Sequence, residues 1–142
     1  MFNLPPLLLN LAVALGIGLL IGAERERRKG QGPARAPAGI RTFSVVALAG
    51  AISVMVGGAP VLAVTVAGVA ALIAVAYFRS RDKDPGLTTE IALVLTALLG
   101  GLAMQQPALA AGTAVALAAL LAARTPLHHF VRPVLTEAEV RE

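Results

Sequence analysis

Three long runs without a charged residue constrain what this chain can fold into. They cover residues 4–23, 42–78 and 91–123, and are 20, 37 and 33 residues long. A helix needs about 20 apolar residues to cross the ~30 Å hydrocarbon core of a bilayer. The first run is therefore long enough for one membrane-spanning helix, whereas the second and the third are each long enough for two.

The composition agrees with a membrane protein. Hydrophobic residues make up 57% of the chain and charged residues 14%, against about 25% charged in soluble domains. There is no cysteine, which excludes disulfides and thiolate metal sites. The chain has one Tyr and no Trp to stack on bases, and its basic residues flank the apolar runs, so a nucleic-acid partner is not expected.

Turn-forming residues divide the second and third runs. The second contains Gly57-Gly58-Ala59-Pro60 and the third Gln105-Gln106-Pro107, and a proline often opens a helix. The sequence thus predicts an all-α integral membrane protein with five transmembrane helices. The expected spans are residues 4–23, 42–57, 60–78, 88–104 and 107–123.

The positive charges predict the orientation of these spans. All twelve Lys and Arg residues lie in the first connection, the third connection or the C-terminal tail. By the positive-inside rule, the N-terminus is outside and the C-terminus is cytoplasmic. All eight acidic residues lie on the same side, so we expect any ionic chemistry at the cytoplasmic face.

A shift of 47 residues relates two parts of the chain. It places residues 39–42 on 86–89 and Pro60 on Pro107. The pattern suggests a parallel repeat of two helical hairpins, an arrangement known in membrane proteins. Several other matches are between alanines, and these carry little weight in an alanine-rich chain.

Small residues mark a packing face on the first span. Ala14, Gly18 and Gly22 recur every four residues, which lets another helix backbone approach closely. Packing within the chain and a seam between two copies both remain open.

Two charges at the cytoplasmic face stand at helix ends that do not favour them. A helix C-terminus carries partial negative charge and its N-terminus partial positive charge. Glu24 lies at a predicted C-terminus and Arg41 at a predicted N-terminus, so we expect them to compensate each other or to hold a ligand. The alternatives are a carboxylate bonded to neighbouring Arg side chains and a basic anchor that extends towards the headgroups.

Glu90 is the third candidate, because its span reaches membrane length only if residues 88–90 join the helix. Ionisable groups at that depth are costly and usually functional, although an acid in the first turn also suits the helix dipole. Glu24 and Glu90 could together ligate Mg²⁺, which prefers carboxylates and retained waters. The many Arg residues nearby argue against a strong cation site and would suit an anionic ligand or anionic lipid headgroups just as well. The sequence shows no nucleophile–base pair, phosphate loop or metalloprotease motif, so an enzyme is not expected.

Three short segments resemble the signature segments of the MgtC/SapB family of membrane proteins in order and spacing. They are Gly22-Ala23-Glu24-Arg25-Glu26, Ala38-Gly39-Ile40-Arg41-Thr42 and Gly86-Leu87-Thr88-Thr89. The similarity covers roughly residues 10–123. Glu90 replaces a residue that is usually small in MgtC, and the tail does not resemble the soluble domain of MgtC itself. Both features are similar to a longer family of unknown function, in which an MgtC-like half precedes a second membrane half.

The resemblance implies a multi-pass protein of the bacterial inner membrane that is connected with Mg²⁺ adaptation. It also implies a set of site residues, with Glu90 contributed by the longer family only. The corresponding positions are Glu24, Arg25, Arg41, Thr42, Thr88, Thr89 and Glu90.

We expect residues 1–126 to form the transmembrane domain and residues 127–142 a cytoplasmic tail or linker. Thr136 and Glu139 have the spacing of a capping box, which opens a helix, so a further membrane half is expected to follow.

Two functions remain open. One is a transport module of Mg²⁺ homeostasis, gated at the cytoplasmic face by Glu24, Arg41 and Glu90. The other is a non-transporting regulator whose basic cytoplasmic face binds partner membrane proteins or anionic lipids. In both cases the chain is expected in the lipid bilayer, and a second copy of the chain, as a homodimer, is one candidate partner. A hydrated path needs polar side chains at depth, and the candidates are few: Asn10, Ser44, Ser53, Thr65, Thr96 and Thr113.

Overall fold

The computed structural model describes residues 5–27, 39–80 and 87–123, and every regular element in those segments is an α-helix. The helices are α1 (Pro6–Arg27), α2 (Ile40–Ser80), α3 (Leu87–Ala103) and α4 (Pro107–Ala122). The expected all-helical fold is therefore confirmed for these segments. The predicted tail at residues 127–142, with its capping box, lies outside the described residues.

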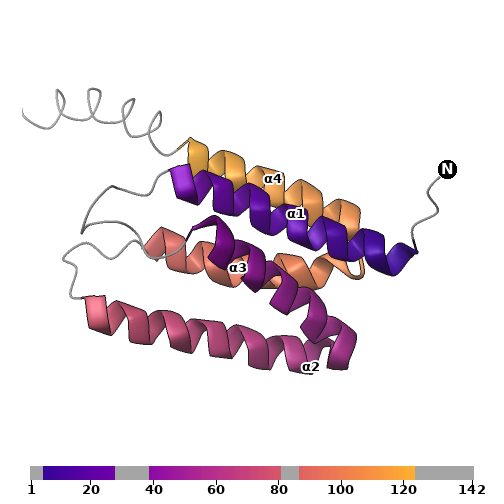
Figure 1. The fold of residues 1–142 in the computed structure, drawn as a ribbon, viewed down its shortest axis with the longest axis horizontal. Coiled ribbons are helices and arrows are strands. Elements are labelled where there is room, and N and C mark those ends of the chain that lie inside the picture. The colour runs from indigo at the N-terminus through magenta and orange to yellow at the C-terminus, as the bar shows by residue number, and fades with distance from the viewer. Residues whose placement is uncertain (1–4, 28–38, 81–86, 124–142) are drawn as a thin grey trace, which may run out of the picture.

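Two glycines divide α2 into two arms. Gly57 (φ −155°, ψ 16°) and Gly58 (φ 71°, ψ −151°) depart from helical geometry. The positive φ of Gly58 is a conformation that residues with a Cβ rarely adopt. We call residues 40–56 the first arm and residues 59–80 the second arm. Figure 1 shows α2 folding back on itself, so the predicted turn separates two helical segments.

Two of the described helices are long and apolar enough to cross a membrane, namely α1 and the part of α2 from Ile40 to Arg79. The helices α3 and α4 are apolar but shorter, at 17 and 16 residues, and 17 helical residues extend about 26 Å. Many large apolar side chains are exposed on all of them. These properties are typical of a membrane protein, while the five separate spans and their orientation stay predictions.

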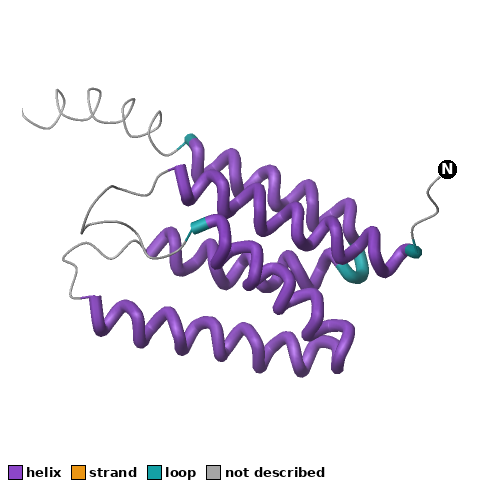
Figure 2. The backbone as a smooth tube through the Cα atoms, viewed as in Figure 1, coloured by secondary structure: helices purple, strands orange, loops and turns teal. Residues whose placement is uncertain are grey.

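The bundle has a charged end and an uncharged end. Helix α4 lies beside α1, and the second arm of α2 lies on the opposite flank of the bundle (Figures 1 and 2). The turn at residues 57–58 and the loop at 104–106 both lie at the right of these views, and the charged helix ends lie at the left. The charged end contains all charged residues of the described segments: Glu24, Arg25, Glu26, Arg27, Arg41, Arg79 and Glu90.

The small residues of α1 lie against the first arm of α2. Ala14, Gly18 and Gly22 are all buried. A Cβ added at Gly18 would lie 2.6 Å from the Cα of Ser44, and one added at Gly22 would lie 2.7 Å from the Cα of Ile40. Glycine therefore allows these two backbones to touch within one chain.

The first arm and α3 also touch through their backbones. A Cβ at Gly50 would lie 1.9 Å from the carbonyl oxygen of Ala97. These two positions are equivalent under the 47-residue shift, and the first arm and α3 run in the same direction (Figure 1). Direct contact between equivalent positions is what a two-fold axis between hairpins requires. The repeat itself stays a prediction, because the matching residues in the sequence are few.

Asn10 joins α1 to the turn that directly follows α3, at the uncharged end of the bundle. Its Nδ2 donates a hydrogen bond to the carbonyl oxygen of Met104, at 3.1 Å. Asn10 therefore bonds to another helix, as expected for a polar residue inside an apolar span.

Replacing Asn10 should loosen this end of the bundle. We expect Asn10→Leu to lower the apparent free energy of unfolding by ~1 kcal/mol, the usual net value of one hydrogen bond. Titration of the detergent-solubilised protein with SDS, followed by circular dichroism, measures this difference. Thr113→Val is the control, because that hydroxyl bonds to Leu109 of its own helix at the exposed surface. Equal losses in both variants would contradict an interhelical role.

Candidate functional site

The charged end is organised around a buried cation. Arg25 lies in the last turns of α1 with only 6% of its surface exposed. Its Nη1 donates a hydrogen bond to Oγ1 of Thr89 in the first turn of α3, at 3.0 Å. A charge taken out of water is costly unless polar groups surround it, so this contact is central to the site.

Arg25 and Asn10 bond α1 to both ends of α3. Asn10 bonds to Met104 and Arg25 bonds to Thr89, so the bonded positions are 15 residues apart on each helix. At ~1.5 Å per residue, the two bonds stand about 22 Å apart. The helices α1 and α3 are therefore antiparallel and fixed in register at both ends.

The helix dipole explains why a cation such as Arg25 is favourable near the C-terminus of α1. It does not predict that this side chain is buried. The signal that could have found it is the stripe of small residues on α1. Buried residues of α1 follow a 3-4 spacing that begins with Ala14 and continues through Gly18 and Gly22 to Arg25. Extending the packing face by one helical turn therefore places Arg25 inside the bundle.

Glu26 connects α1 to α2. Its Oε2 accepts a hydrogen bond from the backbone N–H of Ile40, at 3.0 Å. This amide is one of the N–H groups at the start of α2 that no helical carbonyl satisfies, and a negative charge there also suits the helix dipole. An acid at the unfavourable end of α1 thus stands at the favourable end of α2, which sequence reasoning did not recognise.

Glu24 is bound within its own helix. Its Oε2 lies 3.2 Å from Nη2 of Arg27, and the exposed fractions of the two side chains are 12% and 68%. Arg41 and Thr42 are exposed at the start of α2. Among the described residues there is no ion pair between Glu24 and Arg41. Bonding of Glu24 to a neighbouring Arg, the alternative reading, is what these contacts show.

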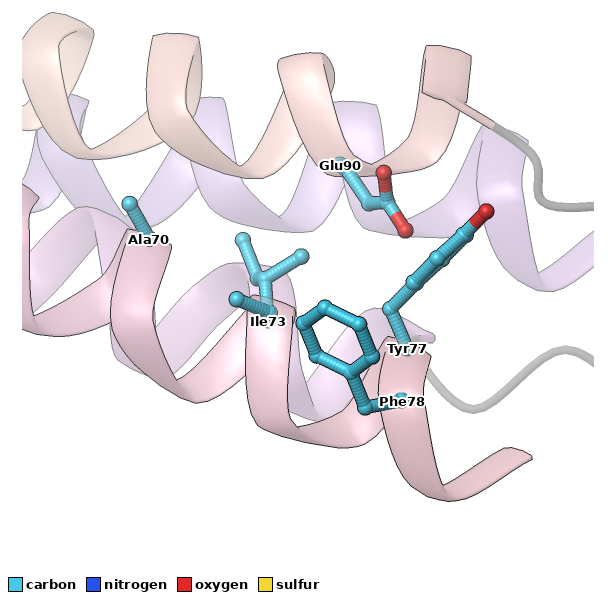
Figure 3. A pocket seen from close by; sticks show the side chains of 6 residues that line it. Ala70, Ile73, Tyr77, Phe78 and Glu90 are labelled. Carbon is cyan, nitrogen blue, oxygen red and sulfur yellow. The ribbon is translucent and has the colours of Figure 1, made fainter. Parts of the chain in front are cut away.

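Glu90 faces away from the Arg25 junction. It is half-buried on α3 and borders an open pocket of about 280 Å³ against the second arm of α2 (Figure 3). The pocket has no lining residue from α1. The neighbouring Thr88 is exposed, whereas Thr89 bonds to Arg25. The structure therefore joins Arg25 with Thr89 but does not bring Glu24, Arg41 and Glu90 into one site.

The described residues contain no large cluster of metal-binding side chains. Within residues 5–27, 39–80 and 87–123, no group of three or more His, Cys, Asp or Glu side chains is close enough to hold a metal ion. The carboxylate of Glu24 contacts a guanidinium, and Glu90 stands among apolar and aromatic residues. The expected site of two carboxylates completed by retained waters stays a prediction.

The hydroxyl groups at depth are bonded to backbone carbonyls. Four of them donate to the carbonyl oxygen four residues earlier in their own helix, at 2.6–2.8 Å: Ser44, Ser53, Thr96 and Thr113. The Oγ atoms of Ser53 and Thr65 are 2.5 Å apart across the bend of α2. Because Ser53 has a single hydroxyl hydrogen, which it donates to Ala49, Thr65 is the donor in the second contact.

A family model described as the MgtC family matches residues 11–130, which is most of the chain. No curated protein and no solved structure gives a significant match.

Proposed function

The chain belongs to the MgtC family, and from this premise we propose that it is a membrane protein of Mg²⁺ homeostasis that acts on partner membrane proteins. In this proposal its own helices do not conduct Mg²⁺. We further propose that it is a multi-pass protein of the bacterial inner membrane. The arms of α2 count as separate passes, and the charged end faces the cytoplasm.

The closed centre of the bundle carries the proposal. The first arm of α2 and α3 approach so closely that a Cβ at Gly50 would lie 1.9 Å from the Ala97 oxygen. A Cβ at Gly100 would lie 2.0 Å from the Ala47 oxygen. Backbones in contact leave no space for a column of water between them, and interiors of this kind are close-packed.

The polar side chains at depth agree with a closed bundle. Ser44, Ser53 and Thr96 donate their hydroxyl hydrogens to backbone carbonyls, so none of them needs water in a channel as a hydrogen-bond acceptor. Hydroxyl groups of membrane helices commonly satisfy themselves in this way. A cation that leaves water would find few oxygen atoms to replace its hydration shell.

The charged end offers a basic surface to a partner. Glu24 and Glu26 are engaged within the chain, by Arg27 and by the start of α2. Arg41 and Arg79 are exposed at the same end of the bundle. Such a surface favours membrane proteins with acidic cytoplasmic segments, through complementary charge that is screened by salt. A second copy of the chain could pack on the exposed alanines of the second arm, so the homodimer is also retained as a proposal.

Reconstitution in liposomes tests the proposal. We expect no Mg²⁺ uptake above that of empty liposomes, for the wild-type chain and for Glu24→Gln alike, with an ionophore as the positive control. Cells from which the gene for this protein has been deleted should nevertheless regain growth in low Mg²⁺ when they express the wild-type chain. Charge reversal at Arg41 should impair that growth at an unchanged membrane level of the protein.

Mg²⁺ uptake by the wild type that is lost in Glu24→Gln would overturn the proposal. It would establish the transport alternative, with a path formed between copies of the chain and Glu24 on that path.

A further inference from the structure

An open pocket lies between the second arm of α2 and the start of α3. It has a volume of about 280 Å³. Its lining consists of Ala70, Ile73, Ala74, Tyr77, Phe78 and Glu90. Five of these residues come from one face of α2, and Glu90 is contributed by α3. The pocket therefore combines an apolar wall with a single carboxylate.

Figure 3 shows how the lining is ordered along the helices. Glu90 extends from α3 towards α2, and its carboxylate lies above Phe78 and beside Tyr77. Ile73 and then Ala70 follow along the second arm, away from the charged end of the bundle. The polar part of the pocket is thus at the charged end, and the apolar part runs towards the middle of the membrane.

The carboxylate is available to a ligand. Among the described residues the side chain of Glu90 makes no hydrogen bond or ion pair, and the residue is only half-buried. The Tyr77 and Phe78 rings lie edge to face, with centroids 5.9 Å apart and an interplanar angle of 83°. A carboxylate with aromatic rings next to it suits a cation, because ring faces also attract positive charge.

We propose that this pocket binds a phospholipid with a primary-amine headgroup, such as phosphatidylethanolamine. The ammonium group donates hydrogen bonds to the carboxylate of Glu90 and contacts the ring of Phe78. One acyl chain lies along Ile73 and Ala70. The proposal rests on the membrane placement of the chain but not on how the chain acts in Mg²⁺ homeostasis.

The chemistry of the pocket distinguishes among the lipids of a bilayer. A choline headgroup has a positive charge but no N–H, so it cannot donate a hydrogen bond to Glu90. A lipid with a glycerol headgroup has no positive charge to offset its phosphate, so it would bring net negative charge to the carboxylate. A primary ammonium carries three donors on a compact charge, as the side chain of Lys does.

Native mass spectrometry of the whole chain in detergent tests the proposal. The protein is titrated with phosphatidylethanolamine, with its mono- and dimethylated forms, with phosphatidylcholine and with phosphatidylglycerol, all with identical acyl chains. We expect phosphatidylethanolamine to bind about tenfold more tightly than phosphatidylcholine, the value of one charge-assisted hydrogen bond. Along the methylation series, the largest decrease in affinity should come between the dimethylated lipid and phosphatidylcholine, where the last N–H is replaced by a methyl group.

Two variants and two controls locate the site. Glu90→Gln should reduce binding of phosphatidylethanolamine to the level of phosphatidylcholine, and Ala74→Leu should weaken both lipids by filling the groove. Glu24→Gln removes a carboxylate from the same end of the bundle outside the pocket, and should leave the preference unchanged. Ala116→Leu adds the same bulk to an exposed position on α4 and should also have no effect.

Equal binding of the amine and choline lipids would overturn the proposal, and so would a preference for phosphatidylglycerol. An amine preference that survives Glu90→Gln would overturn it as well. None of these results depends on whether the chain conducts Mg²⁺, so this proposal and the proposed function can fail separately.

Discussion

Gly50→Ala is expected to disrupt the helix bundle although it adds a single methyl group. The new Cβ would lie 1.9 Å from the carbonyl oxygen of Ala97 and 2.9 Å from its carbonyl carbon. These atoms belong to the backbone of α3, so they cannot rotate away as a side chain would. Overpacking a core costs about 1–3 kcal/mol, and we expect a loss at or above ~3 kcal/mol here. SDS titration followed by circular dichroism measures it.

Gly112→Ala and Gly68→Ala are the matched controls, because a Cβ at either position has no atom within 4 Å. Alanine favours a helix over glycine by about 1 kcal/mol, so both controls should be neutral or slightly stabilising. Gly100→Ala should behave like Gly50→Ala, since its Cβ would lie 2.0 Å from the Ala47 oxygen. Equal stability of Gly50→Ala and Gly112→Ala would show that α2 and α3 are not in backbone contact.

The helices could be predicted from the sequence because the signal for them is long. Apolar runs without charge extend over many turns, and proline and glycine interrupt them where the chain turns. The predicted span at residues 88–104 begins and ends one residue later than α3 (Leu87–Ala103). The predicted span at residues 107–123 begins with α4 (Pro107–Ala122) and ends one residue after it. The predicted first span, residues 4–23, ends four residues before α1 does, because α1 continues through four charged residues to Arg27. A helix does not have to end where its apolar residues end, since charged side chains can extend into water.

The candidate site was less predictable because it depends on which side of a helix each residue faces. The dipole argument considers only distance from a helix end, and it therefore selected Glu24. Successive residues of a helix point about 100° apart, so Glu24, Arg25 and Glu26 face three directions. In the structure they contact α1 itself, α3 and α2, respectively. The stripe of small residues on α1 indicates which of these side chains faces the bundle interior, whereas charge and helix polarity do not.

Prediction of pairs between helices fails for a related reason. The expected grouping of Glu24, Arg41 and Glu90 at the cytoplasmic face was inferred from helix ends and span length, which give only the depth of each residue in the membrane. Depth is one coordinate, and a contact also requires that both side chains point into the same space. Glu90 points towards the second arm of α2, whereas Arg41 is exposed at the start of the first arm.

Thr89→Val is expected to destabilise the charged end while keeping the shape of the side chain. Valine fills the same space but cannot accept the hydrogen bond from Nη1 of Arg25. A buried charged donor that loses an acceptor costs ~2–3 kcal/mol, since water does not replace the acceptor at a site with 6% exposure. The expected result is a loss of this size in the apparent free energy of unfolding, measured by SDS titration.

Thr88→Val is the matched control, because Thr88 precedes Thr89 in the same helix and is exposed. Its effect should lie within about 0.5 kcal/mol of zero, as for most surface substitutions. A double-mutant cycle with Arg25→Met isolates the bond itself. Without the guanidinium, Thr89→Val should cost little, so the coupling energy should be ~1.5–3 kcal/mol. If the two substitutions are additive, the contact between Arg25 and Thr89 does not hold α1 against α3, and the two helices must be held together at this end by their apolar packing.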